Sequence, residues 1–164
     1  MIRLKNIVKG KQVNSCGDCT LCCTVLPIHG AGIVPTTAAC ESCTHLGDNG
    51  CSRHSERADV CKNFLCLYAL GATQVKPLES GVVWTTKVTP AGDFVRGHCA
   101  DVDAAAKHPD TQRMLKYAKD AKQFTYLTLQ DSKRVDGYNL KDGSTRTNQI
   151  KQEGMFNEII PGSV

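Results

Sequence analysis

Ten of the 164 residues are cysteines, and nine of these lie between Cys16 and Cys66. In a protein core a free cysteine packs like any other small hydrophobic residue. Packing alone therefore gives no reason for so many cysteines in one segment. Such a cluster indicates either a disulfide framework or a set of metal ligands. The choice between these two determines how this part of the chain can fold.

The N-terminal sequence MIRLKNIVKG alternates charged and aliphatic residues and contains no apolar run of the kind a secretory signal requires. No stretch of about 18 apolar residues occurs, so we expect no membrane span. A chain that stays in a reducing cytoplasm keeps its thiols reduced. We therefore predict a cytoplasmic protein whose cysteines bind metal.

The spacing of the cysteines supports metal binding. Two intervening residues let both sulfurs of a C-x2-C knuckle turn toward one ion. Cys16 and Cys19 form one such knuckle, and Cys40 and Cys43 form another twenty residues later. This spacing is typical of a four-cysteine zinc site, although it does not say which cysteines share an ion.

The adjacent pair Cys22 and Cys23 suggests that there are two centres. Neighbouring side chains in an extended segment point to opposite sides, so one ion seldom takes both. Further cysteines could then complete two sites of four: Cys43, Cys51, Cys61 and Cys66. Possible additional ligands lie outside these eight, namely Cys40, His45 and Cys99.

Several short motifs accompany the cysteines: Cys16-x2-Cys19-x2-Cys22-Cys23, Cys43-x-His45-Leu46, Gly50-Cys51-Ser52 and Glu56-Arg57-x3-Cys61-x2-Phe64-x-Cys66. This order resembles the YkgJ-type cysteine-cluster family, described as a putative zinc- or iron-chelating domain. The match covers roughly residues 15 to 68. The resemblance implies chelation by eight cysteines: Cys16, Cys19, Cys22, Cys23, Cys43, Cys51, Cys61 and Cys66.

Four thiolates suit both tetrahedral zinc and iron–sulfur clusters. We favour about two zinc ions, because closed zinc sites supply folding energy where a segment has little core. Iron or an iron–sulfur cluster with a redox or enzyme-supporting role is the alternative. His-Glu-x2-His, phosphate-loop and nucleophile-elbow motifs are absent, so we lean against an enzyme and predict no catalytic residue.

The formal charge of +4 would by itself suggest acidic partners. Eight thiolates and two divalent ions would bring that sum to zero, and no run of five basic residues occurs. Nucleic acid is therefore an unlikely partner, and we predict a protein partner or assembly. The candidate contact surfaces are a hairpin around Trp84 and the polar region 131–150.

The chain divides into a cysteine-cluster metal-binding module, residues 1–80, and an α+β extension, residues 81–164. The module is rich in loop-forming residues, with one helix expected over 55–70 and ended by Gly71. The extension is expected to hold a hairpin over 82–96, a helix from Pro109 to about Lys122, a strand over 124–129, and turns in 131–147. The predicted fold class is α+β, with a small irregular metal-stabilised module followed by the extension.

Overall fold

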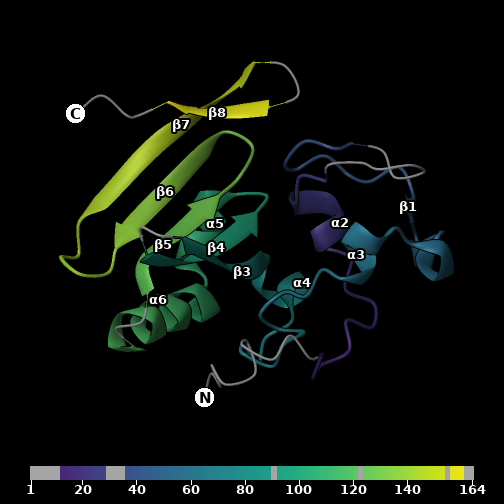
Figure 1. The fold of residues 1–164 in the computed structure, drawn as a ribbon, viewed down its shortest axis with the longest axis horizontal. Helices are drawn as coiled ribbons and strands as arrows, with labels where there is room; N and C mark the ends of the chain where they lie inside the picture. The colour runs from purple at the N-terminus through teal and green to yellow at the C-terminus, as the bar shows by residue number, and fades with distance from the viewer. Residues whose placement is uncertain (1–11, 29–35, 90–91, 122–123, 154–155, 161–164) are drawn as a thin grey trace.

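The structure, a computed structural model, describes residues 12–28, 36–89, 92–121, 124–153 and 156–160. It confirms the α+β class, with a mixed sheet, helices packed on it, and a small separate hairpin. Figure 1 shows the N-terminal part, coloured purple to blue, on one side of the sheet. Within the described residues, no helix has the length and apolar character needed to cross a membrane.

The main sheet contains six strands in the order β3-β4-β5-β6-β7-β8. Only β4 and β5 are parallel, and every other neighbouring pair is antiparallel. The strands have these bounds: β3 Val82–Thr89, β4 Gly92–Cys99, β5 Phe124–Gln130, β6 Arg134–Asn139, β7 Thr145–Glu153 and β8 Phe156–Ile160. The predicted hairpin is confirmed, because β3 and β4 pair from Val82 with Cys99 to Thr89 with Gly92.

The parallel pair needs a crossover connection, and helices α5 (Val102–Lys107) and α6 (Pro109–Ala121) provide it. Asp101 caps α5 by accepting hydrogen bonds from the backbone N–H groups of Asp103 and Ala104 at 2.8 and 3.1 Å. The predicted helix from Pro109 is confirmed, as is the strand that follows it. Helix α5 was not predicted.

The turns predicted in 131–147 are confirmed only in part. Asp136 and Gly137 lie inside β6, whereas Gly143 does occupy a turn, with φ +77°. Pairing with β5 and β7 satisfies the backbone of this polar sequence, and Thr147 donates a 2.9 Å hydrogen bond to Asp136. Tertiary pairing here overrides weak local strand propensity.

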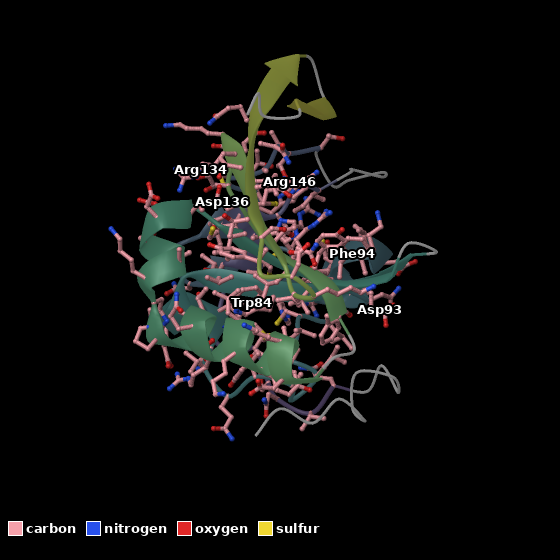
Figure 2. The ribbon with its side chains drawn as sticks, turned by 90° about the vertical axis from the view of Figure 1, so that its left-hand side faces the viewer. Trp84, Asp93, Phe94, Arg134, Asp136 and Arg146 are labelled. Carbon is pink, nitrogen blue, oxygen red and sulfur yellow. The ribbon has the colours of Figure 1, made fainter. Side chains whose placement is uncertain are left out.

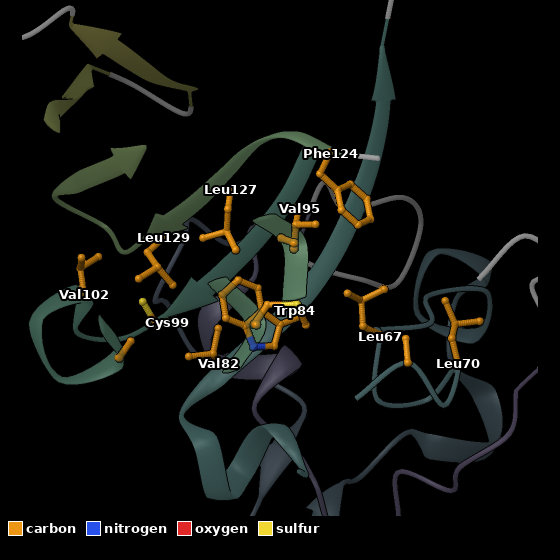
Figure 3. Close-up of a cluster of buried hydrophobic side chains, with 14 residues drawn as sticks. Leu67, Leu70, Val82, Trp84, Val95, Cys99, Val102, Phe124, Leu127 and Leu129 are labelled. Carbon is orange, nitrogen blue, oxygen red and sulfur yellow. The ribbon is translucent and has the colours of Figure 1, made fainter. Parts of the chain in front are cut away.

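The two faces of the sheet bury different clusters. Val82 and Trp84 face helices α5 and α6 and join the larger core, drawn in Figure 3, whereas Val83 joins a smaller one. Figure 2 shows Trp84 on the side of the sheet that faces α6. Trp84 itself is only 2% exposed and cannot be part of a contact surface, whereas the hairpin around it stays a predicted contact surface.

The N-terminal part is built from very short elements: α2 Cys22–Val25, β1 Leu46–Gly47, β2 Gly50–Cys51, the 3-10 turn His54–Glu56, α3 Asp59–Lys62 and α4 Pro77–Ser80. The single helix predicted over 55–70 is wrong, because the backbone is extended at Arg57 and Ala58, with ψ of 142° and 157°. Among the described residues, the smaller core cluster fully buries Val25, Cys66, Ala69 and Val83. Leu67, Leu70 and Ala72 instead join the core of the sheet. The division at residue 80 stays a prediction.

Candidate metal centre

All eight predicted ligands line a single cavity of about 410 Å³, which we call the thiol cavity. Its other polar lining residues include His45, His54 and Arg57. The cysteines come from α2, β2, α3 and the loops before, between and after them, so segments up to fifty residues apart meet here. The structure therefore brings the whole predicted set together.

The first knuckle is a tight turn in which the Cys19 N–H donates to the Cys16 carbonyl at 2.9 Å. Gly17 makes this turn possible, because its φ of +56° lies in the left-handed region that favours glycine. Lys76 holds the knuckle from outside through a 3.0 Å ion pair with Asp18. Backbone geometry thus turns Cys16 and Cys19 toward the same space.

Cys66 reaches this knuckle because residues 13–14 are hydrogen-bonded beside it. The N–H groups of Val13 and Asn14 both donate to the Ala69 carbonyl, at 2.7 and 3.0 Å. Burial raises the pKa of the Cys66 thiol, and the charges of Cys16 and Cys19 raise it further. The three cysteines are electrostatic neighbours.

Cys22 belongs with Cys16, Cys19 and Cys66. Its pKa is raised by a hydrogen bond with Cys23, by burial, and by the charges of Cys23, Cys19 and Cys16. We call Cys16, Cys19, Cys22 and Cys66 the first thiol group.

The remaining four cysteines form a second thiol group: Cys23, Cys43, Cys51 and Cys61. The Cys43 N–H donates to the Cys23 carbonyl at 2.9 Å, and the small β1–β2 hairpin holds Cys51 opposite Leu46. Burial raises the pKa of Cys61, and the charges of Cys23, Cys43 and Cys51 add to this rise. Backbone contacts and electrostatic neighbours agree on this set.

The reason given for separating Cys22 from Cys23 is wrong, although the two fall in different groups. They open the helical turn α2 rather than lying in an extended segment, and their sulfurs are 4.0 Å apart. The hydrogen bond with Cys22 and the charge of Arg57 together lower the pKa of Cys23, against the opposite effect of burial. The two groups thus meet at this pair.

Arg57 entered the sequence analysis only as part of the Glu56-Arg57-x3-Cys61 motif, which gave it no role. Its charge lowers the pKa of Cys16 in the first group and of Cys23 and Cys61 in the second. Its Nε donates to the His54 carbonyl at 3.0 Å, which fixes the side chain at the cavity. Its position four residues before Cys61 was the signal available in the sequence.

The three candidate additional ligands lie in two different places. His45 lines the thiol cavity, whereas Cys40 and Cys99 do not. The Cys40 thiol donates to the Cys99 carbonyl at 3.3 Å, and the Cys99 thiol donates to the Gln130 carbonyl at 3.4 Å. Both therefore lie against the sheet, and the knuckle spacing of Cys40 and Cys43 does not bring these two into one site.

The donor set fits a thiolate-binding metal in number and type, since two groups of four cysteines face one cavity and all ten cysteines are free thiols. The distances between the cysteine sulfurs are not those of a metal-bound site. Zinc–sulfur bonds of about 2.3 Å place the sulfurs about 3.8 Å apart around one ion. Among the described residues, no three histidine, cysteine or acidic side chains are arranged to hold one.

Comparison of the chain with protein-family models, with curated proteins and with solved structures gave no match in any of the three. The resemblance to the YkgJ-type family rests on the order of the cysteines and stays a prediction.

Proposed function

We propose that this chain is a metal-binding protein in which eight cysteines hold two centres. One observation carries the proposal: the eight predicted ligands line one cavity in two groups of four, whereas Cys40 and Cys99 lie elsewhere. The groups follow from backbone hydrogen bonds as well as from thiol electrostatics. Four thiolates are a complete ligand set for a closed site.

We propose that the metals are structural and that zinc occupies both centres. All eight cysteines lie in loops or in elements of at most four residues, and among the described residues the cluster beneath them fully buries only Val25, Cys66, Ala69 and Val83. Metal binding to deprotonated thiols supplies the folding free energy that such a segment lacks. The function is then to hold a surface in shape rather than to catalyse a reaction.

An iron–sulfur cluster is the second candidate, favoured by the size of the cavity. Its volume is about 410 Å³, and the described thiols are too dispersed for three of them to hold one ion. A cluster of several irons and sulfides spans more space than a single ion does. Such a protein would carry electrons or support a modifying enzyme.

Paired substitutions test the two groups. Cys16→Ser/Cys66→Ser should remove one centre, and Cys43→Ser/Cys61→Ser should remove the other, each halving the metal measured per chain. Cys40→Ser/Cys99→Ser is the matched control and should keep the full metal content, because these thiols lie outside the cavity. Metal loss in the control, or full retention in both ligand variants, would refute the assignment.

We propose a protein partner for the surface beside the cavity, in a reducing compartment such as the cytoplasm. Val60, which lines the cavity, is 49% exposed, and Leu78, next to the cavity residue Pro77, is 51% exposed. A photo-crosslinking residue at position 60 should capture the partner, and one at the exposed Lys116 of α6 should not. Equal capture at both positions would argue against this surface.

A further inference from the structure

A second hollow, of about 320 Å³, lies on the face of β3 and β4 turned away from the helices. Thr85, Arg96 and His98 come from the strands, and Thr85 and Arg96 are directly paired. The opposite wall is apolar and belongs to the cysteine-rich part: Leu26, Pro27 and Phe64. These three residues also line the thiol cavity, so the two spaces adjoin.

Arg96 is the central feature of this hollow. It is half-buried, and burial lowers the pKa of its guanidinium. Within the part of the chain that the structure describes, that guanidinium has no ion pair and no hydrogen-bond acceptor. A guanidinium carries five N–H donors in a planar fork that matches a carboxylate or phosphate. A half-buried cation without a counter-charge indicates a place for an anion.

Two buried polar atoms beside Arg96 also have no partner. His98 is 8% exposed and lines the hollow, and its Nδ1 makes no hydrogen bond. Thr128, the strand partner of Arg96 on β5, has a buried hydroxyl that makes none either. Buried polar groups are nearly always hydrogen-bonded, so the unsatisfied Nδ1 of His98, which lines the hollow, marks a place for a polar ligand, whereas Thr128 lies outside the lining. A neutral imidazole can donate through Nδ1 to an anion in one of its tautomers.

The remaining lining adds charge and shape. The exposed Lys87 stands at the rim, and no carboxylate among the described residues lines the hollow. The floor is therefore cationic and the wall apolar. The volume is near the lower limit of small-molecule sites, roughly 300–1,000 Å³. Phe94 and Tyr126, on the same face of the sheet, stack on each other with ring centroids 5.3 Å apart.

We propose that this hollow is a binding site for a small organic anion, with a carboxylate or phosphate on Arg96 and an apolar body against Leu26, Pro27 and Phe64. The site is distinct from the thiol cavity and needs no metal as a ligand. Its apolar wall makes a bare inorganic anion a weaker ligand than an aryl one.

Titration of the full chain with phenyl phosphate, at a measured metal content, tests the proposal. Calorimetry gives the affinity, and the changes in amide chemical shifts locate the binding site. Shifts should centre on residues 26–27, 64, 85–87 and 96–98. Arg96→Gln should weaken binding about tenfold or more, because it removes charge-assisted hydrogen bonds. Lys87→Gln should weaken it about threefold. Lys116→Gln removes the same charge from α6 and should change nothing.

Further ligands identify the anion and exclude other occupants. Phenol should bind far more weakly than phenyl phosphate, and inorganic phosphate should fall between them. Benzoate, compared with phenyl phosphate, distinguishes a carboxylate site from a phosphate site. Unchanged affinity in folded Arg96→Gln, or phenol binding as tightly as phenyl phosphate, would overturn the proposal. If Arg96→Gln does not fold, unchanged affinity in Lys87→Gln overturns it. An oligothymidylate that binds this face more tightly than phenyl phosphate would assign the face to nucleic acid instead.

Discussion

Gly97→Ala is predicted to destabilise the protein, because the structure leaves no room for a methyl group at this position of β4. A Cβ atom on Gly97 would lie 2.7 Å from Cγ1 of Val82, 2.8 Å from Cζ3 of Trp84 and 2.9 Å from Cδ2 of Leu129. All three neighbours are at most 2% exposed and belong to the main core. None of them can move away without disturbing another packed side chain.

The magnitude follows from the balance of two effects. Inserting a methyl group into a packed core costs about 1–3 kcal/mol, and three simultaneous close contacts place this site near the upper value. Replacing glycine by alanine also reduces the entropy of the unfolded chain, which returns about 0.4–1 kcal/mol. The net loss is about 2 kcal/mol, which corresponds to a decrease in Tm of about 4–8 °C for a chain of this size.

Thermal and urea unfolding measure the effect, with Gly137→Ala on β6 as the matched control. The nearest atom to a Cβ on Gly137 is the Arg146 carbonyl oxygen at 3.7 Å, an ordinary contact. That variant should unfold within about 0.5 kcal/mol of the parent chain. Equal stability of the two glycine variants would show that β3, β4 and β5 are not packed as described.

Two further predictions concern charge. Arg57→Gln removes the cation that lowers the pKa of thiols in both groups, so the pH at which half of the zinc is released should rise. The control is Arg53→Gln, which removes an exposed arginine paired with Glu56 and should shift this pH less. An equal shift in the two variants would count against the role of Arg57. His98 has its pKa lowered to about 4 by burial and by Arg96. Because the unfolded chain then binds more protons, His98 lowers stability as pH falls from about 6.5 to 4, by about 3 kcal/mol at most. His98→Gln should flatten this part of the stability-versus-pH curve relative to the parent chain, and an unchanged slope would refute the assignment.

The elements predicted correctly are those in which local sequence and burial agree. The β-branched residues of β3 and the periodic apolar face of α6 form the expected strand and helix. The helix expected over 55–70 failed because its apolar residues serve two different clusters: Phe64 packs with the smaller core and Leu67 with the larger. Periodicity indicated burial correctly for Phe64 and Leu67 but not for Val60, which is 49% exposed, and it could not show that the helix begins only at Asp59 and ends at Lys62.

The candidate site follows the same pattern. The order of the eight cysteines predicts a common site, and the structure places all eight around one cavity. Two centres were predicted, but the membership of each group could not be, because it depends on long-range hydrogen bonds such as Cys43 to Cys23 and Val13 to Ala69. The anion hollow was also not predictable, because Arg96 and His98 become neighbours of Pro27 and Phe64 only through strand register and packing.

The most direct test of the central claim is the metal and sulfide content of the chain purified without oxygen. We expect a colourless protein with about two zinc ions per chain and no acid-labile sulfide. Brown protein containing iron and sulfide would replace zinc by the iron–sulfur alternative while keeping the cysteines as ligands. Less than one metal ion per chain, in protein whose residues 12–72 give the dispersed amide spectrum of a folded region, would contradict the account.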